Sequence, residues 1–92
     1  MFAITFDMVI VDLNKNYRMS YNNAYFEIGK VLRKYEFFST QGSLYLSKNT
    51  DMANLFRAMN ALKQTSWFKD SVRDIRAFRV EDWSNFTEFV KE

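Results

Sequence analysis

The spacing of apolar residues changes several times along this chain, and the order of the changes limits the folds it can adopt. The opening FAITFDMV alternates, which predicts a strand whose strongly apolar face carries Phe2, Ile4, Phe6 and Met8. The polar segment VDLNKNYRMS predicts a connection ending at Ser20, a candidate helix N-cap. Helical spacing then predicts a helix over residues 20–35, with Gly29 packed closely against the sheet.

The second half of the chain continues the same succession of elements. EFFSTQGSLYLS predicts two short strands around Gln41-Gly42, and NTDMANLFRAMNALKQ predicts a second helix. SVRDIRAFRV predicts a fourth strand, and EDWSNFTEFVKE a short helix with Trp83, Phe86 and Val90 on one side. The order β-α-β-β-α-β predicts a single α+β domain over residues 1–92. We expect a ferredoxin-like plaited sheet with both helices on one face and a short C-terminal tail element.

The composition narrows the chemistry that this chain can perform. No Cys and no His are present, which excludes thiol nucleophiles, disulfides and the usual acid–base group at neutral pH. Chemistry would use carboxylates, hydroxyls, Lys, Arg, Tyr or a hard cation such as Mg²⁺. The net charge of +2 permits nucleic-acid binding without arguing for it. Ten Phe and five Tyr exceed the needs of one small core, which favours a subunit interface.

The N-terminal segment shows no targeting signal. MFAITFDMVIVDLN carries Asp7 and Asp12 and lacks a basic region, so it is predicted to be neither a signal peptide nor a membrane span. We expect a soluble, cytoplasmic protein with no membrane partner.

Two opposite charges, Asp74 and Arg76, lie in the middle of the predicted fourth strand. Positions two apart on a strand share a face, so these side chains point the same way. If the apolar residues of the first strand face the helices, Asp7 lies on the opposite, open face. Giving Ile75 and Ala77 to the helix side places Asp74 and Arg76 on that open face with Asp7.

The third strand is predicted to add further polar groups to the open face. If Leu44 and Leu46 face the helices, Ser43 and Tyr45 lie on the same side as Asp7. Arg73 and Arg79 are assigned to the helix side, near the ends of the fourth strand. Three apolar residues are also predicted on the open face: Val72, Phe78 and Val80. Homodimerisation through the open faces would cover them and bring two copies of Asp7 near a two-fold axis.

Each of these residues also has a purely structural interpretation. Asp7 and Asp74 can pair with Arg76 or Arg73 across strands. Ser43 can be a strand-end hydroxyl satisfied by the backbone, and no His is available to activate it. A further set of basic residues is not grouped in one block and can be solvated surface charge: Lys15, Arg18, Arg33 and Lys34.

Four stretches carry a family resemblance that spans nearly the whole chain: FAITFD, TQGSLY, DMANLFRAMNALKQ and WFKDSVRDIRAFRVEDWSNFT. The sequence resembles virulence-associated protein D, the VapD family. The resemblance implies a ferredoxin-like homodimer related to the small CRISPR-associated endoribonuclease family. That related family has an Asp at the end of its first strand and a Gln-x-Ser turn, which Asp7 and Gln41-Gly42-Ser43 match here.

The resemblance also implies an activity: toxin-like cleavage of single-stranded or messenger RNA on the open face of a homodimer, with some members encoded beside a small antitoxin protein. On this basis Asp7, Ser43 and Asp74 are expected to be catalytic, with Asp7 a candidate Mg²⁺ ligand. RNA phosphates are expected to contact Arg76, Arg73 and Lys15.

Two other classes of function remain open. The first is a non-enzymatic nucleic-acid or protein-interaction module, whose charged cluster is an ion-pair network at the dimer interface. The second, a small-molecule sensor, lacks a Gly-rich or otherwise recognisable ligand loop in this sequence.

Overall fold

A four-stranded antiparallel sheet with the strand order β2-β3-β1-β4 forms the centre of the molecule. The computed structural model describes residues 1–17 and 19–92, and all of their side chains except that of Tyr21. The strands are β1 (Phe2–Met8), β2 (Phe38–Gln41), β3 (Leu44–Ser47) and β4 (Val72–Arg79). The central positions of β1 and β3 and the place of β4 beside β1 confirm the predicted ferredoxin-like α+β topology.

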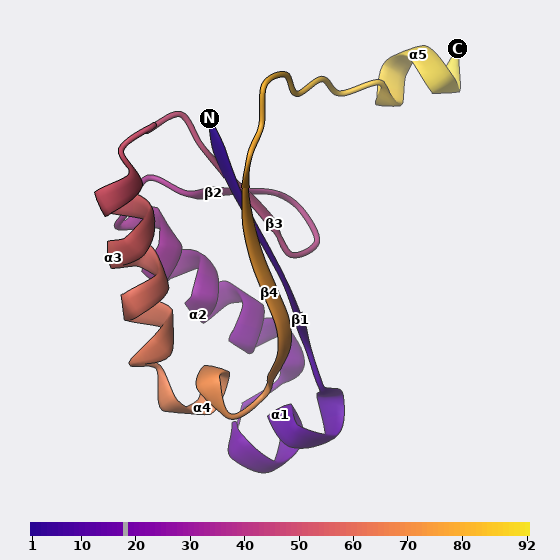
Figure 1. Ribbon diagram of the computed structural model, residues 1–92. Helices are drawn as coiled ribbons and strands as arrows, with labels where there is room; N and C mark the ends of the chain where they lie inside the picture. Colours follow the sequence, from indigo (N-terminus) through magenta and orange to yellow (C-terminus); the bar gives the residue numbers. More distant parts are fainter. Residues whose placement is uncertain (18) are drawn as a thin grey trace.

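Helices α2 (Tyr21–Arg33) and α3 (Met52–Lys63) lie on one side of this sheet (Figure 1). Both begin at polar caps that the sequence indicates. The Ser20 hydroxyl accepts a hydrogen bond from the Asn23 N–H at 3.4 Å, and the Asp51 carboxylate accepts one from the Ala53 N–H at 3.0 Å. Such caps satisfy backbone donors that have no partner inside the helix.

The core forms where the apolar face of β1 meets these helices. Phe6 is 4% exposed; its ring stacks against those of Tyr25 and Tyr45 and meets Phe68 edge-on. Burying a side chain of this size stabilises the fold by about 1.5–3 kcal/mol. The other fully or nearly fully buried apolar residues include Ile4, Leu13, Ile28, Leu32, Phe37 and Leu62.

Two short helices, α1 (Ile10–Asn16) and α4 (Ser66–Lys69), lie at the end of the sheet where β1 finishes and β4 begins. Residues 11–20 were predicted to be a polar connection, which is wrong for residues 11–16, because they belong to α1 and this helix is anchored by the buried Leu13. The Val9 N–H donates to the Ser71 carbonyl at 2.8 Å, which fixes the end of β1 beside the start of β4. The surface charge predicted at Arg18 lies outside the described residues.

The C-terminal arm, residues 81–92, continues beyond the end of β4 (Figure 1), and Trp83 in it lines a pocket with Thr40 of β2. All of its residues are exposed, and its helix α5 covers only Thr87–Lys91. Trp83 therefore precedes the helix that was predicted to include it. Among the described residues, no helix has the length and apolarity needed to cross a membrane.

Candidate active site

The pairing of β1 with β4 brings two carboxylates together. Asp7 lies opposite Asp74 and Thr5 opposite Arg76. Along β1 these positions alternate with Ile4 and Phe6, which are buried in the core beneath the helices, so they lie on the opposite face of the sheet. The prediction that Asp7, Asp74 and Arg76 share the open face is therefore confirmed. Carboxylates directly opposite on neighbouring strands repel each other, so this arrangement needs nearby cations.

A β-bulge supplies one of those cations. The register shifts after Asp7, where Met8 pairs with Val72 and Arg73 becomes an extra residue of β4. Arg73 Nε donates to Asp7 Oδ2 at 3.2 Å, and Nη2 contacts the same oxygen. The assignment of Arg73 to the helix side is thus wrong, as is that of Val72 to the open face, since Val72 packs against the core. The extra residue changes the alternation of the strand at this point.

Arg76 supplies the second cation. Its Nε donates to Asp74 Oδ2 at 3.0 Å and lies 3.3 Å from Oδ1. The hydrogen bond with Asp7, and then the charge of Asp7, raise the pKa of Arg73, so this guanidinium stays cationic. We call Asp7, Arg73, Asp74 and Arg76 the charged cluster. The exposed fractions of its side chains range from 51% to 75%. Ion pairs this exposed contribute little to stability and leave their groups open to a ligand.

The third strand lies in the opposite register to the one predicted. Ile4 pairs with Tyr45 and Thr5 with Leu44, so Tyr45 faces the helices, and Leu44 and Leu46 lie on the open face. Tyr45 is only 2% exposed, and its ring stacks against Phe6 with a centroid distance of 5.8 Å. The prediction for Tyr45 is wrong because its aromatic ring fills core volume that a leucine side chain would leave empty.

Ser43 also lies apart from the charged cluster. Gly42 and Ser43 form the tight turn between Gln41 and Leu44, with Gly42 at a φ of 52°. This positive φ is one that glycine adopts without strain. Ser43 lines a pocket with Asn22 and Tyr25 of the α2 region, so its predicted place on the open face is wrong.

Lys15, expected to contact RNA phosphate, lies exposed in the last turn of α1. It forms no hydrogen bond or ion pair with the charged cluster in the described part of the chain. The structure thus brings together four of the predicted site residues and leaves Ser43 and Lys15 separate.

A metal ion at this site would depend on Asp7 and Asp74. Mg²⁺ prefers carboxylate oxygens, and one or two carboxylates with water commonly hold it, so this pair has suitable donors. No group of three or more potential acidic, His or Cys ligands is found among the described residues.

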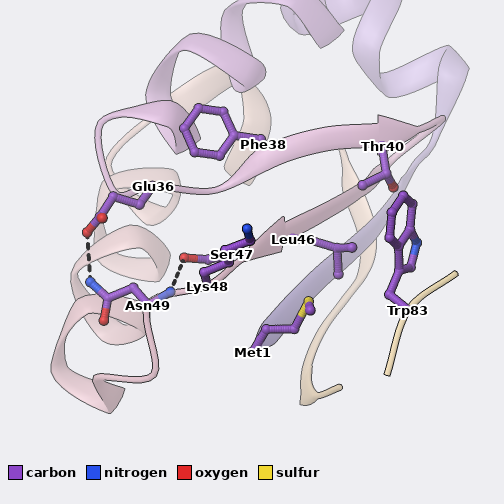
Figure 2. Close-up of a pocket in the computed structure, with 9 residues that line it drawn as sticks. All are labelled: Met1, Glu36, Phe38, Thr40, Leu46, Ser47, Lys48, Asn49 and Trp83. Carbon is purple, nitrogen blue, oxygen red and sulfur yellow. Dashed lines mark hydrogen bonds between the residues drawn. The ribbon is translucent and has the colours of Figure 1, made fainter. Parts of the chain in front are cut away.

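A separate pocket of about 520 Å³ lies towards the other end of the sheet (Figure 2). Met1, Leu46, Phe38 and Trp83 contribute apolar side chains to it. At its polar side, Asn49 Nδ2 donates to Glu36 Oε2 at 2.7 Å. None of the predicted site residues lines this pocket, so we do not assign it to the candidate active site.

Several known proteins are similar in sequence to this chain over almost its entire length. The chain is 61% identical over 84 residues to Endoribonuclease VapD 1 of Riemerella anatipestifer, covering 91% of this chain and 94% of that protein. It is 55% identical over 91 residues to Endoribonuclease VapD of Haemophilus influenzae and 50% identical over 93 residues to Endoribonuclease VapD of Helicobacter pylori, covering 99% of every chain. No protein-family model matches.

The sheet order and the placement of the helices define a ferredoxin-like α+β domain with charged residues on its open face. The chain belongs to the VapD family.

Proposed function

We propose that this chain is an endoribonuclease that cleaves single-stranded or messenger RNA at the charged cluster, acting as a homodimer. The observation that carries the proposal is the facing pair Asp7 and Asp74, each beside an arginine, on a face that no described helix covers. The endoribonuclease names of the relatives support RNA as the substrate. Acidic groups can transfer protons, and arginines bind phosphate with paired donors.

In the proposed reaction, Asp7 acts as the general base. Its carboxylate accepts the proton of an RNA 2′-hydroxyl, and the 2′-oxygen attacks the adjacent phosphorus. The bond to the 5′-oxygen of the next nucleotide breaks, leaving a 2′,3′-cyclic phosphate. Asp74 positions the water that protonates the leaving oxygen, and the hydroxide so formed takes the proton back from Asp7, which restores the carboxylate and the water. Arg73 and Arg76 turn from their carboxylates to the phosphate, whose charge grows as the bond forms.

Ser43 and Lys15 keep a proposed role outside the charged cluster. Ser43 immediately precedes Leu44, which pairs with Thr5 in an antiparallel ladder, so its turn lies beside the part of β1 that ends at Asp7. Its hydroxyl would donate to a phosphate of the bound strand. Lys15 would contribute a long-range attraction for RNA from α1, which follows β1 at the same end of the sheet.

Mg²⁺ is the cation proposed for this site. Asp7 would hold it together with a second carboxylate, either Asp74 or Asp7 of a second copy. The bound ion would neutralise charge on the phosphate. The proton transfer from the RNA 2′-hydroxyl to Asp7 described above does not pass through this ion.

Dimerisation through the open face is supported by the apolar residues there. Leu44 and Leu46, both partly exposed, lie on this face with Phe78, which is 47% exposed. The C-terminal arm adds exposed apolar residues: Trp83, Phe86, Phe89 and Val90. A stable interface buries about 800 Å² on each partner. Light scattering is expected to give a dimer at micromolar concentration, and a mass near the 11.1 kDa monomer would refute this part of the proposal.

The central test compares wild type with Asp7→Asn on mixed single-stranded RNA, with and without EDTA. Losing the base should lower the cleavage rate by a factor on the order of 10² to 10⁴. The melting temperature should change little, because the ion pair with Arg73 is more than half exposed. Loss of wild-type cleavage in EDTA would support Mg²⁺, and full cleavage in EDTA would remove it from the proposal.

Asp51→Asn is the matched control. Asp51 forms an exposed pair with Arg57 at 3.8 Å, and asparagine can keep its capping contact with the Ala53 N–H. This variant should cleave RNA at the wild-type rate. Full cleavage by purified Asp7→Asn would end the case for Asp7 as a catalytic residue.

The ion pairs themselves favour a second candidate, a non-enzymatic nucleic-acid or protein-interaction module. In that case Asp7→Asn would leave Arg73 without its partner and loosen the dimer, while any cleavage would be unchanged. Measuring oligomeric mass and cleavage rate on the same preparations separates the two candidates.

The proposed toxin role predicts a growth phenotype. Expression of the wild type in bacteria should arrest growth, and expression of Asp7→Asn to the same level should not. A small antitoxin protein is the proposed regulatory partner, and its co-expression should restore growth in the wild-type strain.

A further inference from the structure

Two exposed phenylalanines flank a pocket between helix α2 and the edge strand β2. Phe26 is 61% exposed and Phe38 is 55% exposed. The pocket has a volume of about 400 Å³. We call it the α2–β2 pocket, and the residues used below are Phe26, Gly29, Arg33, Phe38, Ser39 and Tyr45. It opens on the helix side of the sheet, whereas the charged cluster lies on the other side.

The pocket is lined by a polar group that belongs to a core residue. Only 2% of the Tyr45 surface is exposed, yet this residue lines the pocket. No hydrogen bond joins its hydroxyl to another described residue. The oxygen lies 3.9 Å from the point where a Gly29 Cβ would stand, so the missing side chain at Gly29 leaves room beside it. The Tyr45 hydroxyl is not among the buried side-chain groups without a partner in the described residues, so it reaches the pocket and is not sealed in the core.

Positive charge surrounds the same opening. Arg33 lines the pocket, and its charge opposes the rise that burial causes in the pKa of Tyr45, so the guanidinium acts on this hydroxyl. Lys30 Nζ lies 5.4 Å from the centre of the Phe26 ring. Aromatic rings beside cations are what proteins use to stack the bases and bind the phosphates of single-stranded nucleic acid.

We propose that the α2–β2 pocket is a nucleotide subsite for single-stranded RNA, away from the bond that is cleaved. One base stacks on Phe26 or Phe38, its polar edge accepts a hydrogen bond from the Tyr45 hydroxyl, and Arg33 binds a neighbouring phosphate. The inference rests on the proposed function for the choice of RNA. It adds to it a place where a base is held.

The neighbouring surface connects this subsite with the end of β1. Gly42 and Tyr25 line both the α2–β2 pocket and the pocket of about 320 Å³ that includes Ser43. The Gly42-Ser43 turn lies beside the part of β1 that leads to Asp7. An RNA strand leaving the charged cluster round this end of the sheet would pass Ser43 before its base enters the α2–β2 pocket.

The test uses a short single-stranded RNA that carries 2-aminopurine at successive positions and 2′-O-methyl groups throughout, so that attack by the 2′-oxygen is blocked. Its dissociation constant and 2-aminopurine fluorescence are measured with wild type, Phe26→Ala, Arg33→Gln and Tyr45→Phe. Phe26→Ala should raise the dissociation constant by about 5-fold to 150-fold and abolish the fluorescence change at one position. Tyr45→Phe keeps the buried ring and should raise it by about 2-fold to 12-fold. Arg33→Gln should lower the salt slope by about 0.7.

Matched controls lie on α3. Phe56 is 68% exposed and Arg57 is also exposed, and neither lines the pocket. Phe56→Ala and Arg57→Gln should bind the probe like wild type. If Phe26→Ala and Arg33→Gln bind no more weakly than these controls, the subsite is refuted, whatever Asp7→Asn does to cleavage. If they bind more weakly but Asp7→Asn still cleaves fully, the subsite stands and the proposed catalytic role of Asp7 fails.

Discussion

Replacing Gly29 with alanine is expected to stabilise the protein. Gly29 lies inside α2, where glycine is about 0.5–1 kcal/mol less favourable than alanine because it loses more backbone freedom on folding. The added methyl group would stand 3.9 Å from Tyr45 Oη and 4.0 Å from Tyr45 Cε1, which is ordinary contact. Nothing needs to move, so the helix propensity decides the sign. For a domain of this size the gain corresponds to a rise of about 2–8 °C in melting temperature.

The same substitution at Gly42 should have the opposite effect. Gly42 has a φ of 52°, and nothing lies within 4 Å of the point where its Cβ would stand. Space is therefore sufficient, but a residue with a side chain is less stable by about 1–2 kcal/mol in this left-handed conformation. Gly42→Ala is expected to lower the melting temperature by about 4 °C or more.

Thermal unfolding followed by circular dichroism tests both variants. All proteins must be compared at one concentration, because the proposed dimerisation would make the melting temperature depend on it. A lower melting temperature for Gly29→Ala would refute the reasoning from helix propensity and contact distance. An unchanged or higher one for Gly42→Ala would refute the reasoning from φ.

Gly29→Ala also tests the α2–β2 pocket, since its methyl group would occupy space beside the Tyr45 hydroxyl. We expect a protein that is more stable than wild type and binds the 2-aminopurine probe more weakly. Loss of folding could not explain weaker binding in a stabilised variant. Unchanged probe binding would mean that the space beside Gly29 is not used.

Three further predictions concern pH, the arm and the open face. Burial raises the pKa of Tyr45 above its ordinary value of 10.0, so the stability that this residue contributes is fully present below pH 10.0 and is lost as the pH rises above it. Tyr45→Phe should therefore flatten the alkaline fall in the free energy of unfolding measured with urea. Parallel curves for wild type and variant would contradict this. A chain that ends at Val80 keeps both backbone hydrogen bonds between Met1 and Val80. It should remain folded by circular dichroism but form a smaller fraction of dimer. An unfolded product would show that the arm stabilises the domain. Leu46→Lys should shift the mass from light scattering towards the monomer, and an unchanged dimer would exclude this part of the open face from the interface.

The order of the four strands and the two long helices could be predicted from the sequence because each of these elements has a clear period, whereas α1 and α4 were missed. The alternation in β1 admits one assignment of faces, since Phe2, Ile4, Phe6 and Met8 form a single apolar row. Asp7 is placed opposite that row by the geometry of a strand, and the pairing of β1 with β4 then fixes Asp74. The family could also be identified at this level, because its motifs extend over most of the chain.

The α1 helix shows a limit of local pattern. Its short sequence, Ile10–Asn16, carries one buried residue, Leu13, and several polar ones, so its period is weak. Contacts with residues distant in the sequence hold this end of the chain, including the hydrogen bond from the Val9 N–H to Ser71. Such contacts leave no signal in the local spacing of apolar residues.

The sequence by itself determined the order of the four strands and the two long helices, and the open-face position of Asp7; the position predicted for Asp74 depended on the strand register, which the structure confirms. Only the tertiary structure decided where Arg73, Ser43 and Tyr45 lie. In β3 both faces carry large side chains, so alternation cannot tell which face is buried, and the fit of the Tyr45 ring against Phe6 and α2 makes the choice. In β4 a single extra residue turns Arg73 towards Asp7, and a bulge depends on how two strands pair, which neither strand specifies alone.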